Sequence, residues 1–277
     1  IIASGADPRT LDVAGEKKII RRLTRENFLV YRNARYVASG TLVVVAGSFS
    51  SKQVIGEIKK RFNALPRKKK SPKPGTKESQ KHPRVAVKFK ASDQSHLVLG
   101  VRAFDVFNSR RYALQVLGDI LGGGMSSRLF QRVREELGAA YYVRAGAELL
   151  LDHGYFAISS GVDHKKIEKV VEIILEEMNR LARELVGKEE LQKAKDHLTG
   201  GVLLGLETSD ALASFYGGQE IVTGKIISPQ ALIQKIRAVK PSEIQALAKT
   251  LFINRKLNLA VIGPYKREAI FRKILKF

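Results

Sequence analysis

Two side chains with complementary hydrogen-bonding chemistry lie seven residues apart near the middle of the chain, in the stretch RVREELGAAYY. The guanidinium of Arg134 is a rigid fork of N–H donors that can bind peptide carbonyl oxygens. The hydroxyl of Tyr141 can donate to the oxygen on which negative charge develops when a carbonyl is attacked. Neither residue hydrolyses a peptide alone. The pair can therefore donate hydrogen bonds to carbonyl oxygens and to an oxyanion, but its chemistry alone does not identify a substrate.

Each of these residues also has a structural interpretation, which the sequence leaves open. Arg134 can form a surface ion pair with a neighbouring glutamate, and Tyr141 can be a half-buried aromatic residue of a strand. Tyr142 would then point to the opposite face of that strand, because successive side chains of a strand alternate. We expect Tyr142 to belong to the core.

Three consecutive glycines, Gly122, Gly123 and Gly124, precede this pair. Glycines before a helix can direct backbone N–H groups at a phosphate. Here they are followed by Met-Ser-Ser, with neither the Lys-Ser/Thr pair of a P-loop nor a G-x-G-x-x-G register. The run therefore favours a joint between two helices over a phosphate site.

Metal ligands are poorly represented in the sequence. None of the five histidines lies one helical turn from another, the spacing that places two imidazoles on one helix face: His82, His96, His153, His164 and His197. The chain has no cysteine, which excludes thiolate ligands, cysteine nucleophiles and disulfides. Asp105 and Asp119 are isolated carboxylates, which are typical of helix caps and surface charges. We expect no metal cofactor in this chain.

The elements that must position these residues alternate between helices and strands. Around the Arg–Tyr pair we predict a helix at 109–121, a second from Ser126 to about Leu137, and strands at 140–150 and 154–161 joined by a turn. A long amphipathic helix follows, with an apolar stripe from Ile167 to Leu181. The other predicted elements are strands at 41–47, 85–90, 95–102 and 257–263, a helix from Ser50 or Ser51, further helices to about 252, and a last helix.

The end of the chain repeats its beginning at low identity. A shift of 216 residues places Tyr36 on Phe252, Val45 on Val261 and Gly47 on Gly263. Both copies are predicted to be a helix, a buried apolar strand, a glycine and a helix. This similarity indicates either duplication or two chance examples of a common unit; the equal spacing favours duplication.

Basic residues exceed acidic ones by 49 to 27, a net charge of +22, which favours anionic partners. The charge is spread along the chain, and its densest run, 67–84, contains prolines and no aromatic residue to stack on a base. We therefore predict a linker there and do not expect nucleic acid as a partner. No apolar stretch reaches the roughly 18 residues of a membrane span, so we hypothesise a soluble, cytoplasmic protein. Because the chain begins with Ile, we expect a segment upstream of it.

The stretch LGGGMSSRLFQRVREELGAAYYV, followed by a hairpin and a long helix, resembles the C-terminal half of the pitrilysin/insulinase/mitochondrial processing peptidase family. These are zinc endopeptidases with an inverted H-x-x-E-H motif. Residues 12–62 resemble the end of that family's N-terminal half. The resemblance implies an α+β fold in which two halves form a clam shell. It divides the chain into the end of a metal-bearing half (1–66), a basic Pro-rich linker (67–84) and a zinc-free substrate-binding half (85–277).

The resemblance also implies roles for particular residues. Arg134 and Tyr141 would contact the substrate and its transition state, and substrate binding would extend to Gly122, Gly123, Gly124 and Ser127. The partners would be a peptide substrate and a metal-bearing half or subunit that holds the zinc, or a second copy of the chain. Because H-x-x-E-H is absent, we expect the chain alone to be inactive. The alternative is a structural or interaction protein that resembles the core subunits of respiratory complex III.

Overall fold

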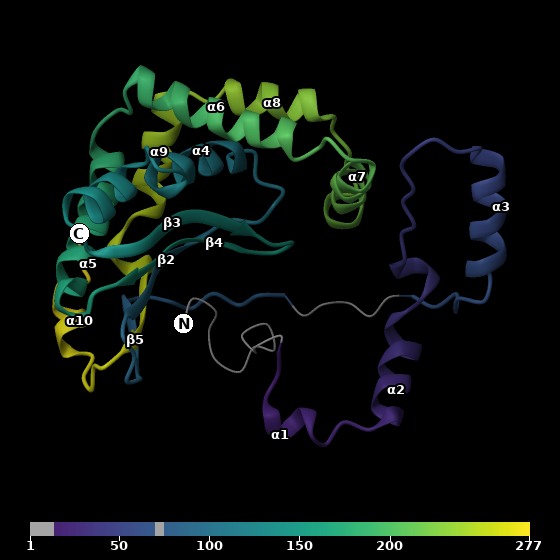
Figure 1. Cartoon of the computed structure of the whole chain (residues 1–277), viewed down its shortest axis with the longest axis horizontal. Coiled ribbons are helices and arrows are strands. Elements are labelled where there is room, and N and C mark those ends of the chain that lie inside the picture. The colour runs from purple at the N-terminus through teal and green to yellow at the C-terminus, as the bar shows by residue number, and fades with distance from the viewer. Residues whose placement is uncertain (1–13, 70–74) are drawn as a thin grey trace. The chain divides into compact units, whose positions relative to one another are not determined.

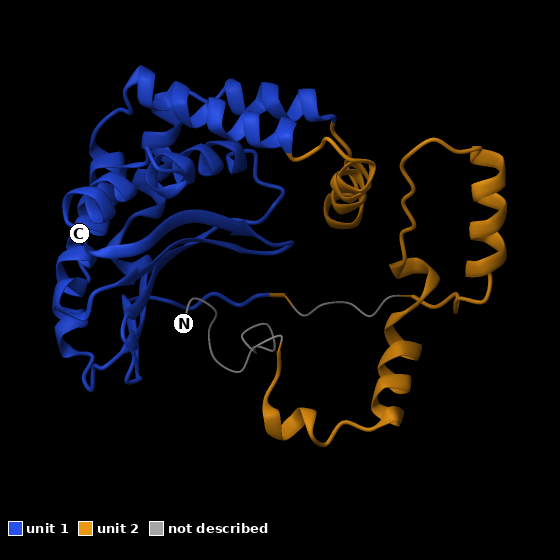
Figure 2. Ribbon diagram, viewed as in Figure 1, with its two compact units in different colours: residues 1–4, 76–204, 228–277 blue, residues 5–75, 205–227 orange. Residues whose placement is uncertain are grey.

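The computed structural model describes residues 14–69 and 75–277 of the 277-residue chain. Its described residues form two compact units (Figures 1 and 2): a larger one of 76–204 and 228–277, and a smaller one of 14–69, 75 and 205–227. The division at residues 66 and 85 stays a prediction. Part of the predicted linker, residues 70–74, lies outside the described residues.

A mixed sheet forms the centre of the larger unit. Within the described residues it contains five strands in the order β1-β5-β2-β4-β3, with these bounds: β1 (Arg84–Phe89), β2 (Ser95–Ala103), β3 (Ala140–Leu149), β4 (Gly154–Val162) and β5 (Leu257–Gly263). β1 is parallel to β5, and the other neighbouring strands are antiparallel. The predicted α+β class with an antiparallel-rich sheet is confirmed, and the five strand predictions in this unit are correct within about a residue.

Helices cover one face of this sheet (Figure 1). The helical elements of the larger unit are α4 (Arg111–Gly122), η3 (Phe130–Glu136), η4 (His164–Lys166), α5 (Ile167–Arg183), α6 (Lys188–Leu204), α8 (Pro229–Arg237), α9 (Pro241–Leu251), η5 (Asn254–Lys256) and α10 (Ala269–Ile274). On β2, Leu97 and Leu99 are buried, whereas Val98 between them is 40% exposed. The opposite face is therefore open at this point.

The core of the larger unit lies between the sheet and its helices. The predicted apolar stripe of α5 is buried there, including Val170, Ile174, Met178 and Leu181. A helix with an apolar stripe is stable when it packs that stripe against another apolar surface, here chiefly α9. This packing fixes the position of α5, which in turn positions the segment that carries Arg134.

The smaller unit has little core of its own. Its helices are α1 (Lys17–Ile20), α2 (Arg25–Arg35), η2 (Ala38–Gly40), α3 (Ser51–Phe62) and α7 (Ser209–Thr223). Among its described residues only Val37 is fully buried, while Phe28 and Tyr31 are each 62% exposed. The N-terminal region therefore has exposed apolar surface in its described residues.

The prediction of a buried strand at 41–47 is wrong. The segment belongs to no sheet, and its four apolar residues Leu42, Val43, Val44 and Val45 are 37–44% exposed. A strand needs a neighbouring backbone to donate and accept its hydrogen bonds. Within the described part of the chain, the backbone of 42–46 has no such partner.

The sequence repeat is present in the local structure. α2 and α9 begin and end 216 residues apart, as do η2 and η5. Both long helices end in the same way: the amide of Tyr36 donates to the carbonyl of Arg32 at 2.8 Å, and that of Phe252 to the carbonyl of Ala248 at 2.8 Å. The same shift places 41–47 on β5. Residues 41–47 and β5 thus follow the same helical elements, but of the two only β5 pairs with other strands in the described residues.

Candidate functional site

The corner between η3 and β3, residues 130–142, carries both predicted substrate-binding residues. Its helical part is π-helical, since the amide of Leu137 donates to the carbonyl of Arg132, five residues back, at 3.3 Å. Gly138 ends it with φ of 56°, a left-handed conformation that glycine adopts at little cost. Lys166 then donates to the carbonyl oxygens of Leu137 at 2.9 Å and of Gly138 at 3.3 Å. The left-handed turn at Gly138 and the two hydrogen bonds from Lys166 therefore fix the backbone of the corner.

A buried ion cluster attaches η3 to the neighbouring helices. Glu177 of α5 is fully buried and accepts hydrogen bonds from Arg132 at 2.8 Å, Arg180 at 3.0 Å and Arg128 at 3.4 Å. Arg128 also binds Glu190 of α6 through two bonds, at 2.7 and 2.8 Å. Burial acts to raise the pKa of Glu177, but the hydrogen bond from Arg132 and the charges of Arg180 and Arg128 bring this pKa below its usual value. Arg128 and Arg132 thus form ion pairs that attach residues 128–132 to α5 and α6.

Arg134 differs from these two arginines. Its side chain is exposed, and its guanidinium carbon lies 4.9 Å from the centre of the Phe130 ring. Within the described residues it forms no ion pair and no hydrogen bond through its side chain, so the surface ion pair does not account for it. A guanidinium stacked on a ring is restricted in orientation while its N–H donors stay free.

Tyr141 lies on a β-bulge at the start of β3. The pairing passes from Ala140–Val162 to Tyr142–Gly161, which leaves Tyr141 without a residue opposite it. Its side chain is 65% exposed and has no hydrogen-bond partner among the described residues. A bulge redirects the side chain of the extra residue. Tyr141 is therefore not the half-buried strand residue of the structural interpretation.

The prediction that Tyr142 belongs to the core is wrong. Its side chain is half-buried on the open face of the sheet, and its hydroxyl lies 3.2 Å from Nδ1 of His96. The ring covers Gly161, where a Cβ would lie 2.6 Å from it. The bulge at Tyr141 explains the error, because it interrupts the alternation on which the prediction rested.

The glycine run brings α4 close to β3. A Cβ on Gly122 would lie 2.5 Å from the amide nitrogen of Ala145, and one on Gly123 would lie 2.2 Å from Oδ1 of Asp119. Both glycines are required by packing. At Gly124 a Cβ would make ordinary contact, 3.6 Å from the ring of His197. The role of these glycines in substrate binding stays a prediction.

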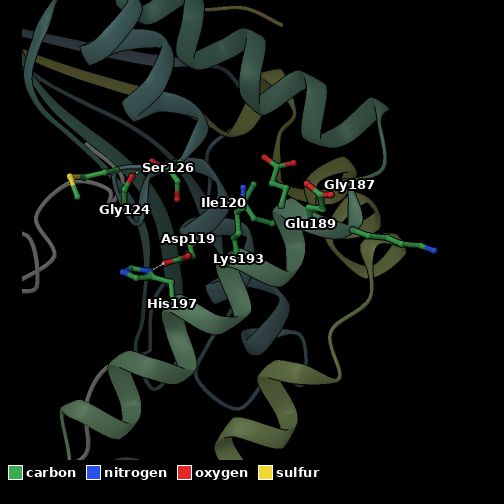
Figure 3. Close-up of a pocket in the computed structure, with 13 residues that line it drawn as sticks. Asp119, Ile120, Gly124, Ser126, Gly187, Glu189, Lys193 and His197 are labelled. Carbon is green, nitrogen blue, oxygen red and sulfur yellow. Dashed lines mark hydrogen bonds and ion pairs between the residues drawn. The ribbon is translucent and has the colours of Figure 1, made fainter.

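A cavity of about 930 Å³ lies beside this run (Figure 3). It is lined by Asp119, Ile120, Gly124, Met125, Ser126, Ser127, Gly187, Lys188, Glu189, Glu190, Lys193, Ala194 and His197. The hydroxyl of Ser127, which is 5% exposed, donates to the carbonyl of Gly124 at 2.6 Å. Two of the predicted site residues, Gly124 and Ser127, thus line one cavity.

The same cavity contains a pair that the sequence did not reveal. Nδ1 of His197 lies 2.7 Å from Oδ1 of Asp119, and in Figure 3 the imidazole points toward the carboxylate. Burial raises the pKa of Asp119, and the hydrogen bond and charge of His197 partly oppose this rise. The two residues are 78 positions apart. The available signal was Asp119 itself, a charged residue in the otherwise apolar second half of α4.

The residues present do not fit a zinc ion. Across the described ranges, no three His, Asp or Glu side chains lie together in a group that could hold a metal. Nδ1 of His153 lies 2.8 Å from Oδ1 of Asp152, and Nδ1 of His164 lies 2.6 Å from the hydroxyl oxygen of Ser95.

Among the described residues, no helix combines the length and the apolar composition that a membrane span requires.

Sequence similarity to known proteins indicates the family to which this chain belongs. The family model described as "Peptidase M16 inactive domain" matches residues 22–198. A relative from Mycobacterium leprae, described as an uncharacterized zinc protease, is 31% identical over 264 residues, which cover 94% of this chain and 59% of that protein. The chain spans between 56% and 59% of the length of the first curated relatives that it matches.

Solved structures share the fold at low identity. The peptidase M16 inactive domain from Pseudomonas fluorescens has a TM-score of 0.86 and 18% identity, over 96% of this chain and 64% of that chain. A chain of complex III2 from Candida albicans has a TM-score of 0.79 and 16% identity, over 96% of this chain and 66% of that chain. The match of the family model, together with the shared fold, confirms the resemblance to zinc metallopeptidases: this chain belongs to the peptidase M16 inactive-domain family.

Proposed function

We propose that this chain supplies the zinc-free, substrate-binding half of a metalloendopeptidase whose metal is held by another half or subunit. Its membership of the M16 inactive-domain family and relatives described as zinc proteases support this proposal. The observation that carries it is the corner at 130–142. There Arg134 and Tyr141 are exposed, and their side chains have no hydrogen-bond or ion-pair partner among the described residues, on a backbone fixed by Gly138 and Lys166.

The two side chains would act at different stages of peptide hydrolysis. Arg134, restricted by its contact with Phe130, would donate to backbone carbonyls of the bound peptide and hold it in position. Tyr141 would donate its hydroxyl proton in a hydrogen bond to the oxygen that becomes negative when the scissile carbonyl is attacked. Fixing both donors in advance avoids reorganisation during the reaction, which is why the rigidity of the corner matters.

The glycine run and its cavity would extend the binding surface. Gly122 would contribute by allowing α4 to approach β3 closely, and Gly123 by leaving room for the carboxylate of Asp119. Gly124 and Ser127 would line the wall of the cavity that receives part of the peptide. Because the walls of this cavity include both Asp119 and Lys193, it would accept polar as well as apolar side chains.

Kinetics of the reconstituted enzyme test the proposal. Tyr141→Phe removes one hydroxyl and keeps the ring, so we expect kcat to fall by roughly 10²–10³-fold with KM nearly unchanged. Arg134→Ala should also raise KM, since its donors are used by the ground-state complex. The matched controls are Tyr142→Phe, on the neighbouring residue, and Arg267→Ala, on an exposed loop of the same unit.

Unchanged kcat and KM in both variants, with circular dichroism of the folded protein also unchanged, would contradict the proposed roles. A loss in the Tyr142→Phe control equal to that in Tyr141→Phe would do the same. It would show that turnover depends on the structure of β3 rather than on the exposed hydroxyl of Tyr141.

A second candidate is a structural protein that keeps the fold without hydrolysis. The likeness to a chain of complex III2 from Candida albicans supports it. The two candidates differ in one measurement. When the chain is purified together with its natural partners, chelator-sensitive peptide hydrolysis supports the peptidase, whereas a stable assembly without hydrolysis supports the structural role.

A further inference from the structure

A second cavity, of about 290 Å³, lies at one end of the sheet in the larger unit. It is formed where β2 ends, where η5 leads into β5, and where residues 78–81 precede β1. Its lining residues are Glu78, Ser79, Gln80, Lys81, Arg102, Arg255 and Lys256. Four of these seven are basic and one is acidic, so the cavity is electropositive. It shares no residue with the corner at 130–142 or with the cavity of Asp119.

Arg102 is the buried cation of this cavity. It is 5% exposed, and its Nη1 donates to Oε1 of Glu78 at 3.1 Å. Its Nε is buried and has no hydrogen-bond partner among the described residues. The side chain of Glu78 is 51% exposed, so this carboxylate neutralises the buried guanidinium only in part. A buried charged donor that lacks a partner is costly, which makes an additional acceptor favourable here.

Three further basic residues line the same cavity: Lys81, Arg255 and Lys256. Burial lowers the pKa of Lys256, the positive charges of Arg255 and Arg110 lower it further, and Glu78 opposes them. Nζ of Lys256 donates to the carbonyl of Thr250 at 3.1 Å. Arg255 is exposed, and its guanidinium has no ion-pair partner among the described residues. At Lys256 the repulsion by Arg255 and Arg110 therefore exceeds the attraction by Glu78.

The wall of the cavity is fixed before any ligand binds. Nε2 of Gln80 donates to the carbonyls of Arg255 at 3.0 Å and of Leu257 at 3.1 Å. Its Oε1 accepts a hydrogen bond from Asn258 of β5 at 3.1 Å. The segment 78–81 is thus attached to the sheet, and a ligand would meet a prearranged set of donors, which reduces the entropy lost on binding.

We propose that this cavity binds a small oxyanion. The cavity lies at the lower end of the roughly 300–1,000 Å³ typical of small-molecule sites, which suits a compact anion. An anion with two or more oxygens can accept from the forked donors of Arg102 and Arg255 and from Lys256 together. Two sources present this chemistry: inorganic phosphate, and the C-terminal carboxylate of a peptide.

Calorimetric titration of the full 277-residue chain tests the proposal. The arms are inorganic phosphate, an N-acetylated dipeptide acid, its C-terminal amide, and sodium chloride at equal ionic strength. We expect saturable binding of phosphate or of the dipeptide acid, and none of the amide or chloride. Whichever anion binds identifies the source.

A matched pair of variants separates the site from general charge. Arg255→Gln with Lys256→Gln should weaken anion binding by roughly tenfold or more, since charge-assisted hydrogen bonds are lost. Lys266→Gln with Arg267→Gln removes the same charge from an exposed loop of the same unit and should leave the affinity unchanged. The single variant Arg255→Gln, whose side chain is exposed, covers the case in which the double variant does not fold.

Equal losses in the two double variants would overturn the proposal, because they would show attraction to net charge alone. So would the absence of saturable binding of either anion up to about 10 mM, well above a millimolar Kd. The readout is binding to the chain alone. It is therefore independent of whether a reconstituted enzyme hydrolyses peptides.

Discussion

The arginines of residues 128–134 have different tasks although they share one short segment. Arg128 and Arg132 reach the buried carboxylate of Glu177, whereas Arg134 stacks on Phe130 and keeps its donors free. The sequence could identify Arg134 through the family resemblance of the segment that it shares with Tyr141. It could not show which arginines form ion pairs, because Glu177 and Glu190 lie on helices that are far away in sequence but close in space.

The buried carboxylate gives a prediction with a defined pH dependence. Glu177→Gln should lower the free energy of unfolding at pH 7 by about 1–3 kcal/mol, because three arginines lose a charged acceptor but keep or regain other contacts. The folded state holds the pKa of Glu177 below its ordinary 4.5. The stabilisation is therefore present above the unfolded value and is lost as the pH falls through the folded pKa.

Urea unfolding of the wild type and the Glu177→Gln variant at pH 7 and at about pH 3 measures this effect. The control is Glu172→Gln on the same helix, where the carboxylate is 47% exposed and pairs with Lys169. Such surface pairs contribute little. A difference between wild type and the Glu177 variant that persists undiminished at acid pH would contradict the assignment.

At the scale of elements, the corner at 130–142 was predicted in outline but not in geometry. Helical periodicity indicated a helix to about Leu137, and the structure ends η3 at Glu136. The π-helical hydrogen bonds and the bulge at Tyr141 depend on how the segment is held by α5 and β4. Local propensity carries no such information, so the exposure of Arg134 and Tyr141 had to be seen in the structure.

The close approach of α4 to β3 gives a second prediction. Gly122→Ala places a Cβ within 2.5 Å of the backbone of Ala145, so we expect a loss of about 1–3 kcal/mol from overpacking. Gly200→Ala on α6, where a Cβ meets nothing within 4 Å, should instead stabilise the protein by up to about 1 kcal/mol. Thermal or urea denaturation of both variants compares the two. Equal effects would mean that α4 has room to move away from the sheet.

At the scale of the whole molecule, the repeat predicts how the segment 41–46 is used. A shift of 216 residues places it on β5, which is parallel to β1 and antiparallel to β2. We expect 41–46 to gain two such neighbours when a metal-bearing half is supplied. Hydrogen exchange should then show strong protection of amides 42–46, while those of α3 change little. Reconstituted hydrolysis without new protection there would refute this pairing.

The lack of a three-ligand group gives a further prediction. After dialysis the purified chain should retain no stoichiometric zinc and hydrolyse no fluorogenic peptide, because its described residues offer only pairs such as Asp119 and His197. Elemental analysis and an assay with and without chelator test this. Turnover by the pure chain that a chelator abolishes would contradict it.

The strands of the larger unit could be predicted because their apolar runs have partners within this chain. The run at 41–47 has the same character, yet it belongs to no sheet in the described residues. An apolar run indicates that a segment can form a strand, but it does not show whether a neighbouring strand is present to pair with it. The ion cluster of Glu177 and the pair of Asp119 with His197 escaped prediction for a related reason, since each joins residues far apart in sequence.

The place of β5 in the sheet has a consequence for how the protein acquires its structure. β1 and β2 are successive in sequence, but β5 lies between them, and Arg84 is paired with Asn258. The strand that closes the gap is thus synthesised long after the two strands that it joins. Contacts of such long sequence separation slow folding. Until synthesis passes Gly263, the nascent chain exposes two unsatisfied strand edges, so a chaperone that shields them would raise the yield more than any change to the completed core.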